Sequence, residues 1–169
     1  MILVVGSANM DMIIKSDVLP HPGETVIGGT FSMVPGGKGA NQAVAAARLG
    51  GQVAFAACVG DDEIGRALTQ TYERERIDTS MISTIGGAHT GVAFIFVDSH
   101  GQNMISVASG ANALFSPDRL AALDRLARPP RWMLLQLEIS LVTVEAAARW
   151  AKDRRVGVIL DPAPAPRVG

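Results

Sequence analysis

The segment with the clearest potential for ligand chemistry is a glycine-rich turn that leads into an alanine-rich helix. It reads Gly36-Gly37-Lys38-Gly39-Ala40-Asn41. Glycines before a helix give a tight turn whose backbone N–H groups are free and which a ligand can approach closely. Lys38 adds a donor, and the Asn41 amide can donate and accept. The turn is not a P-loop, because Lys38 is followed by glycine. A glycine turn that only starts a helix is the alternative.

A second polar segment, Asn9-Met10-Asp11, follows the first apolar run of the chain. Open α/β sheets bind ligands beyond the carboxyl ends of their strands, which is where this segment is expected. Asn9 and Asp11 would there form hydrogen bonds with a polyhydroxylated ligand. An Asx turn that only connects the strand to the next element explains the same residues.

The elements that must position these residues alternate between strand and helix. Four short apolar runs predict strands of a parallel sheet buried on both faces, at residues 2–5, 53–59, 132–135 and 156–160. Helical patterns lie between and after them, at residues 41–49, about 62–74, 117–127, and from 140 or 143 to about 154. Asp61 is expected to cap the second helix, and Ser116-Pro117 to start the third. This alternation predicts an α/β fold with right-handed crossovers.

Two stretches interrupt that rhythm and predict a small β lid inserted into the α/β body. Residues 12–34 contain β-type segments at 12–14 and 25–27, and residues 91–108 read as a hairpin with its turn at 98–101. Both faces of the hairpin are apolar, and an antiparallel sheet of that kind needs cover on both sides. One face could close over a ligand, and the other could meet a second subunit.

Composition narrows the class of partner. The chain has 169 residues, about one domain, of which 48% are hydrophobic and 18% charged, with a net charge of −1. That charge predicts no binding to nucleic acid or to an anionic membrane surface. No signal peptide or membrane span is expected, and Cys58 is the single cysteine, expected in the core. The three histidines lack metal-ligand spacing, so no metal site is predicted. The expectation is a soluble cytoplasmic protein that binds a small molecule.

The two polar segments together resemble the ribokinase-like family of sugar kinases. Other stretches with that family's pattern lie in register along essentially the whole chain: Pro22-Gly23-Glu24-Thr25, Gly60-Asp61-Asp62-Glu63-Ile64-Gly65, Thr90-Gly91-Val92-Ala93, Gly110-Ala111-Asn112, Leu135-Gln136-Leu137-Glu138 and Asp161-Pro162-Ala163-Pro164-Ala165. The resemblance implies a parallel sheet flanked by helices, with a β lid that also clasps a second subunit into a homodimer.

The resemblance also implies a sugar site and a reaction. Asn9 and Asp11, with Met10 between them, would bind sugar hydroxyls, and Glu138 would accept from another hydroxyl. The glycine-rich turn would hold the sugar through donors, within Gly37, Lys38, Gly39, Ala40 and Asn41. Such a set suits a neutral polyol, which needs several acceptors and amides. The complete enzyme would move the γ-phosphoryl group of Mg-ATP to the 5-hydroxyl of D-ribose, with K⁺ as monovalent cation.

Other parts that the resemblance implies are missing. The family's nucleotide site, cation loop and catalytic base lie in its second half, where an aspartate follows Gly-Ala-Gly, and this chain has no such segment. We therefore expect residues 1–169 to be the N-terminal part of one ribokinase-like domain, with the catalytic aspartate beyond Gly169 and no activity of its own. The alternatives are a kinase for another sugar, such as fructose 1-phosphate, and a non-catalytic carbohydrate-binding or dimerisation module.

Overall fold

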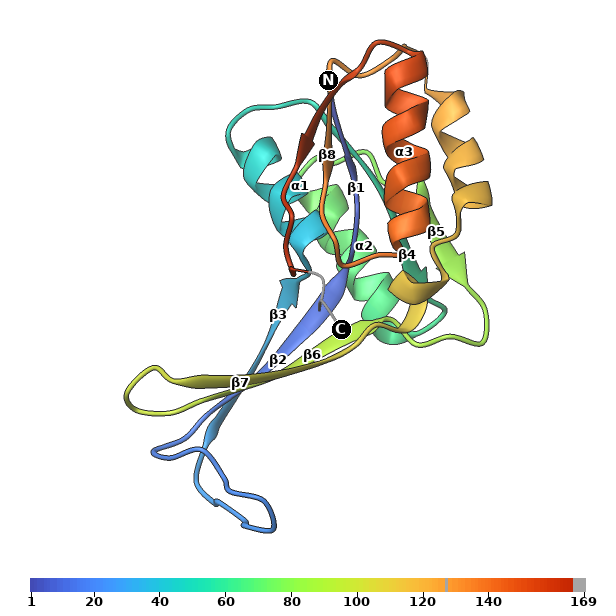
Figure 1. Cartoon of the computed structure of the whole chain (residues 1–169). Coiled ribbons are helices and arrows are strands. Elements are labelled where there is room, and N and C mark those ends of the chain that lie inside the picture. Colours follow the sequence, from blue (N-terminus) through green and yellow to red (C-terminus); the bar gives the residue numbers. More distant parts are fainter. Residues whose placement is uncertain (127, 166–169) are drawn as a thin grey trace.

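The body of the protein is built on a five-stranded sheet in the order β5-β4-β1-β8-β9, in which all neighbouring strands are parallel (Figure 1). The computed structural model describes residues 1–126 and 128–165. The strands are β1 (Ile2–Val5), β4 (Val53–Gly60), β5 (Ile82–Ile85), β8 (Trp132–Leu135) and β9 (Gly157–Leu160). The four predicted strands are confirmed. β5 was not predicted, because its four residues, with two polar residues between two isoleucines, form no apolar run.

Helices cover both faces of this sheet, which confirms the predicted fold class. α1 (Lys38–Arg48) and α2 (Glu63–Arg74) lie on one face, and α3 (Leu141–Asp153) lies on the other with the 3₁₀ helix η2 (Pro117–Arg125) (Figure 1). All residues of β4 are buried, since it lies between the two layers. Burial raises the pKa of the Cys58 thiol in β4 to about 11, so Cys58 is the core residue that was predicted.

Three local predictions for the helices need correction. The helix expected over 117–127 is a 3₁₀ helix, and its expected last residue, Ala127, lies outside the described residues. Its buried residues Leu120 and Leu123 are three apart, the spacing that a 3₁₀ helix places on one side. α1 begins at Lys38 and not at Asn41. The cap of α2 is Asp62, whose Oδ1 accepts from Gly65 N at 2.7 Å, whereas Asp61 forms an ion pair with Arg66.

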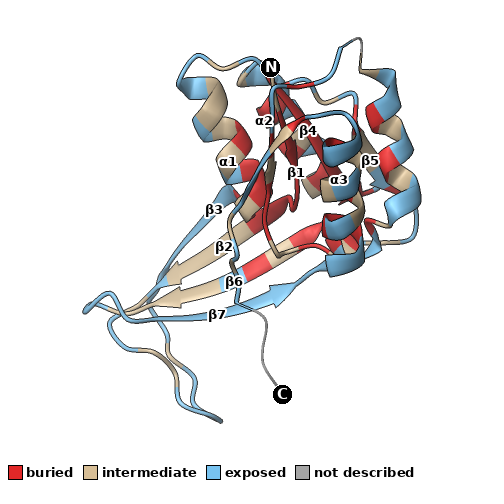
Figure 2. Cartoon of the chain, turned by 45° about the horizontal axis from the view of Figure 1, so that its top comes forward, coloured by how far each residue is buried: buried red, intermediate tan, exposed pale blue. Residues whose placement is uncertain are grey.

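A second sheet projects from the body where the lid was predicted, and we call it the lid sheet. Its strands are β2 (Asn9–Lys15), β3 (Thr30–Gly36), β6 (Gly91–Val97) and β7 (Asn103–Ala108), in the order β3-β2-β6-β7. β6 and β7 pair antiparallel, which confirms the hairpin predicted over residues 91–108. β2 and β6 are parallel, so the lid sheet as a whole is mixed. Figure 2 shows buried residues concentrated in the body, while most of the lid sheet is half-buried or exposed.

The boundaries of the lid sheet also differ from the prediction. Its first segment spans residues 9–36 and not 12–34, so Asn9 and Asp11 lie inside strand β2 and not in a connecting turn. Residues 25–27 form no strand, since they pair with no neighbouring strand. Gly28, with a φ of 106°, separates them from β3. Within the described residues, no helix has both the length and the apolar character needed to cross a bilayer.

A hydrogen-bonded cluster anchors the start of β6 to the body. The carboxylate of Asp62 accepts from Thr90 N at 2.7 Å and from Thr90 Oγ1 at 2.6 Å, and Thr90 Oγ1 accepts from Gly60 N at 2.9 Å. Burial acts to raise the pKa of Asp62, but the hydrogen bonds from Thr90 and Gly65 outweigh it and lower that pKa. The cap of α2 therefore also fixes the point where the lid sheet leaves the body.

Candidate functional site

Polar side chains from distant parts of the chain meet where the lid sheet joins the body. A cavity of about 400 Å³ opens there. Its lining comes from β2, the lid strand β7, the 3₁₀ helix η1 (Gly110–Leu114), the loop between β8 and α3, and the segment after β9: Asn9, Val107, Ser109, Asn112, Ala113, Leu137, Glu138, Ile139, Ser140 and Pro164. It lies beyond the carboxyl ends of β1 and β8, where parallel sheets bind ligands.

Glu138 is the charged residue in the wall of this cavity, and one of its oxygens is already engaged. Oε2 accepts from Ser7 Oγ at 2.6 Å and from the backbone N–H of Lys38 at 2.8 Å. Ser7 is fully buried behind it. Among the described residues, Oε1 of Glu138 forms no hydrogen bond, so this oxygen remains to accept from a ligand.

The glycine-rich turn supports Glu138, and three of the N–H groups that the sequence predicted to be free are already engaged. Besides Lys38 N, Gly39 N donates to Ser7 Oγ at 3.4 Å and Ala40 N to Ser7 O at 2.9 Å. Gly37, the N-cap of α1, has no side chain to satisfy these first-turn donors, so Ser7 and Glu138 do so. A Cβ at Gly39 would lie 2.6 Å from Ser7 N, which explains the glycine.

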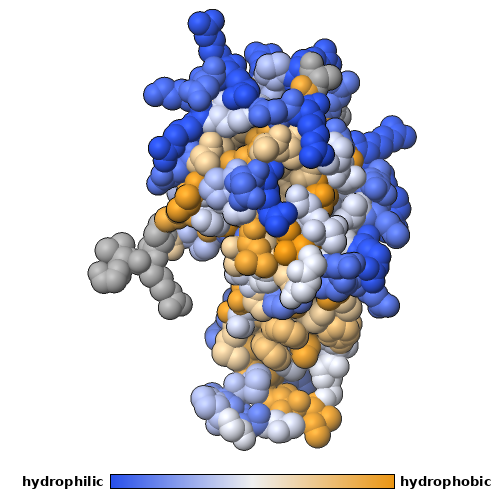
Figure 3. All heavy atoms as spheres, turned by 90° about the vertical axis from the view of Figure 1, so that its right-hand side faces the viewer, coloured by the Kyte–Doolittle hydropathy of each residue, from blue (hydrophilic) through white to orange (hydrophobic). Residues whose placement is uncertain are grey.

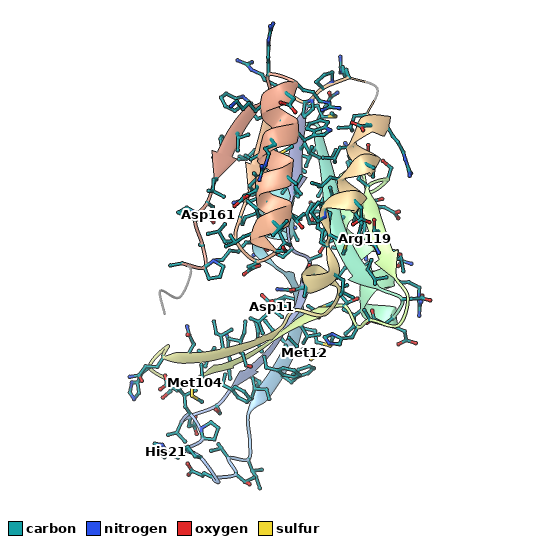
Figure 4. The ribbon with its side chains drawn as sticks, turned by 45° about the vertical axis from the view of Figure 1, so that its right-hand side comes forward. Asp11, Met12, His21, Met104, Arg119 and Asp161 are labelled. Atoms are coloured by element: carbon teal, nitrogen blue, oxygen red, sulfur yellow. The ribbon has the colours of Figure 1, made fainter. Side chains whose placement is uncertain are left out.

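Asp11 brings a second carboxylate to the junction between lid sheet and body (Figure 4). It lies on the same face of β2 as Asn9 and is half-buried. Its carboxylate covers Gly36, where a Cβ would overlap it. Burial, together with the negative charge of Glu138, raises the pKa of Asp11 above its ordinary value. The site therefore holds two close acceptors, and ionised Asp11 is held there at some cost in stability.

Other predicted residues lie outside the cavity. Met10 and Ala40 are buried in the core cluster beneath α1 and α2. Asn41 is exposed and lines a second cavity of about 440 Å³ between these helices, next to the ion pair of Arg48 and Glu75. Of the predicted residues, Asn9 and Glu138 line this cavity. Asp11 lies close enough to Glu138 to feel its charge, and the glycine-rich turn contacts Glu138 through Lys38 N. Met10, Ala40 and Asn41 do not line the cavity.

Two contributing residues had no predicted role. Ser7 follows β1 and Gly6 directly, and its position just past a buried strand was the available signal. Asn112 lies in a stretch that carried the family resemblance, but nothing in the sequence shows that it reaches β2. Its side chain is 2% exposed and contacts both Ala8 and Asn9. Within residues 1–126 and 128–165, no three His, Cys, Asp or Glu side chains are grouped to hold a metal ion.

The body, the lid sheet and a cavity lined by Asn9, Asn112 and Glu138 define an α/β protein with a polar cavity beyond the carboxyl ends of its strands. The chain belongs to the pfkB family of carbohydrate kinases, whose pattern matches residues 1–168. The family predicted from the sequence is thereby confirmed.

Individual relatives agree with this assignment. A ribokinase of Haemophilus influenzae is 44% identical over 162 residues, or 96% of this chain and 53% of that protein. The structure of Giardia lamblia ribokinase has a TM-score of 0.88 at 30% identity, over 98% of this chain and 51% of that chain. Arabidopsis thaliana ribokinase complexed with ribose and ATP has a TM-score of 0.81 at 32% identity, over 96% of this chain and 53% of that chain. The chain spans about half the length of these relatives.

Proposed function

We propose that this chain is the sugar-binding half of an ATP-dependent kinase that phosphorylates D-ribose at its 5-hydroxyl. The observation that carries the proposal is the convergence of Asn9, Asp11 and Glu138 on the junction of body and lid sheet. A neutral polyol is held by several hydrogen-bond partners, and Oε1 of the half-buried Glu138, which has no partner among the described residues, can accept from a hydroxyl. The names of the relatives, and ribose in one of their structures, support ribose as the sugar.

A kinase for a sugar phosphate such as fructose 1-phosphate is less compatible with this site. Asp11 and Glu138 are close enough for the charge of one to raise the pKa of the other. A phosphate beside this pair would add further negative charge, which like-charge repulsion opposes. The site therefore favours a neutral sugar.

Mg-ATP and K⁺ are proposed for the complete enzyme and assigned to the half of the relatives that this chain does not match. Phosphoryl transfer depends on groups that position and neutralise the phosphates and on a base that reaches the attacking hydroxyl. In this proposal the described residues supply the partners of the sugar, and the phosphates and the metal ion belong to the other half. The cytoplasmic location stays a prediction.

The chain alone is expected to show no ribose-dependent turnover of ATP. A coupled assay for ADP release, with purified chain, ribose, Mg²⁺ and K⁺, measures this. Asp161, just after β9, is the residue here that could serve as a base, so Asp161→Ala is the matched variant (Figure 4). Turnover that scales with protein concentration and disappears in Asp161→Ala would contradict the expectation. Without turnover, ribose binding distinguishes a sugar-binding half from a module that only dimerises.

Asp11→Asn tests the sugar site, with opposite expected effects on binding and stability. Ribose affinity should fall by about 1–3 kcal/mol, because the amide removes one acceptor from the sugar. The melting temperature at neutral pH should rise, because the variant removes a carboxylate whose ionised form burial and Glu138 disfavour. Calorimetry with ribose and thermal unfolding measure the two effects. Unchanged ribose affinity in a folded Asp11→Asn variant would reject the assignment.

The pH dependence of that gain in stability has a definite sign. The pKa of Asp11 is raised in the folded state, so the folded protein binds this proton more tightly than the unfolded chain. Below pH 3.8, the pKa of Asp11 in the unfolded chain, Asp11 is protonated in both states and does not lower the free energy of unfolding of the wild type. As pH rises through the higher pKa of the folded state, Asp11 ionises and the wild type loses stability. The gap in melting temperature between variant and wild type should widen over that interval.

We further propose a homodimer that forms through the lid sheet. Residues on its outer face, which we define by Met12, Ile14, Phe31, Met33, Phe94, Phe96 and Met104, are aligned by the register of the four strands. Figure 3 shows apolar residues gathered over this part of the molecule. Four of them are strongly exposed: Phe31 61%, Phe94 46%, Met33 44% and Met104 43%. Exposed apolar patches of this kind mark contact surfaces.

A further inference from the structure

Asn112 forms a closed set of hydrogen bonds that connects η1 to the start of the lid sheet. Its Oδ1 accepts from Ala8 N at 2.9 Å, and its Nδ2 donates to Ala8 O at 3.1 Å. The same Nδ2 donates its other proton to Asn9 Oδ1 at 2.7 Å. The side chains of Asn112 and Asn9 are both nearly inaccessible to solvent, and both residues line the cavity of about 400 Å³.

This arrangement permits one orientation of each amide. The N–H of Ala8 can only donate and its carbonyl can only accept, so they fix which end of the Asn112 amide is oxygen and which is nitrogen. The nitrogen then faces Asn9 and takes up the oxygen of the Asn9 amide. A Cβ at Gly91 would overlap Asn112 Nδ2 and Asn9 Oδ1, so the two amides fill the space that this glycine leaves.

We propose that Asn112 is a positioning residue, which makes Asn9 a hydrogen-bond donor to the ligand. With Oδ1 of Asn9 engaged, its Nδ2 group is the end left for the cavity. The ligand group opposite Asn9 must then be an acceptor, whereas Asp11 and Glu138 require donors. A hydroxyl can serve either partner, but a fixed pattern of one donor and two acceptors limits which sugars and which poses satisfy every group. This inference rests on the proposed sugar site.

Two substitutions test it from opposite sides. Asn9→Asp keeps an oxygen for Asn112 and turns the end that faces the cavity from a donor into an acceptor. Asn112→Asp replaces the donor to Asn9 with an oxygen. Each should weaken ribose binding about 10- to 100-fold, because a buried partner is left unmatched. The exposed Asn103 on β7 gives the matched control, and Asn103→Asp should leave ribose affinity unchanged.

Calorimetry with ribose on the 169-residue chain and the double variant Asn9→Ala/Asn112→Asp completes the test. If Asn112 acts through Asn9, the double variant should lose no more affinity than Asn9→Ala alone. A folded Asn9→Asp variant that binds ribose as tightly as the wild type would overturn the proposal, and it decides the case even if Asn112→Asp fails to fold. Additive losses in the double variant would also overturn it.

Hydrogen exchange separates this inference from the proposed function, because it needs no sugar. Both side-chain amide protons of Asn112 should exchange with deuterium more slowly than those of Asn103, and Asn9→Ala should speed up exchange at Asn112. Equal rates at Asn112 and Asn103 would overturn the positioning role. If the wild type fails to bind ribose while Asn112 stays protected, the sugar assignment fails and the hydrogen-bond set stands.

Discussion

Replacing Glu138 with alanine is expected to reduce ribose affinity at least about 100-fold and to destabilise the fold. The substitution removes the acceptor that faces the cavity, and it also removes the partner of Ser7 Oγ and of Lys38 N. Donors left unpaired cost about 1–3 kcal/mol each when they are buried. The lost contact with the sugar and the loss of order at the start of α1 should both lower ribose affinity. Calorimetry with ribose and thermal unfolding measure the two effects.

Glu138→Gln is the matched control for this prediction. Its amide oxygen can still accept from Ser7 and Lys38, so stability should remain near that of the wild type. Without the charge of Glu138, the pKa of Asp11 should fall toward its ordinary value. Ribose binding should weaken less than in the alanine variant. A folded Glu138→Ala variant with wild-type affinity would show that this carboxylate does not contact the sugar.

Phe94→Asp is expected to convert the proposed dimer to a monomer. Phe94 lies on the outer face of the lid sheet, opposite Met12 on β2 and Ser106 on β7. In a two-fold interface the introduced charge would lie in an apolar contact on both subunits, and burial of an unpaired charge is strongly unfavourable. The dissociation constant of the dimer should rise by at least about 100-fold, which corresponds to about 2–3 kcal/mol. Light scattering over a range of concentrations measures the mass, and Phe96→Asp, on the same face, should act alike.

Ile105→Asp provides the control for position. Ile105 is 57% exposed but lies on the opposite face, aligned with Ile95 on β6. The same charge there should leave the dimer intact. If Phe94→Asp and Phe96→Asp both remain folded dimers, the outer face of the lid sheet is not the interface. If Ile105→Asp alone dissociates the dimer, the interface uses the opposite face of the lid sheet, which carries Ile95 and Ile105.

Much of the body could be predicted from the sequence, because its signals are local. Buried parallel strands are short apolar runs, and the strand from Val53 is apolar along almost its whole length since both faces are covered. The start of β3 was harder to locate, because residues 25–27 have the composition of a strand and two glycines alone separate them from it. The parallel pairing of β2 with β6 depends on contacts between distant segments, which no local pattern reports.

The site was predicted only in part, because local sequence signals identify its residues but not the contacts that they form. Asn9, Asp11 and Glu138 were identified by motif, and the structure brings them to one junction. The glycine-rich turn was expected to present free N–H groups, but Ser7 and Glu138 occupy them. Residue types reveal donors and acceptors, but the pairs that they form depend on the fold. The role of Asn112 in particular follows only from its contact with a residue more than a hundred positions away.

The parallel pairing of β2 with β6 also has a consequence for the order in which the molecule assembles. β2 lies near the start of the chain, and β6 follows only after α1, β4, α2 and β5. Joining such distant segments carries a large loop-closure cost, which the intervening elements reduce once they have packed into the body. The lid sheet should thus form late in folding and open early in unfolding. Its integrity depends on a completed body, so a damaged core would first reduce the sugar binding and the subunit association proposed above.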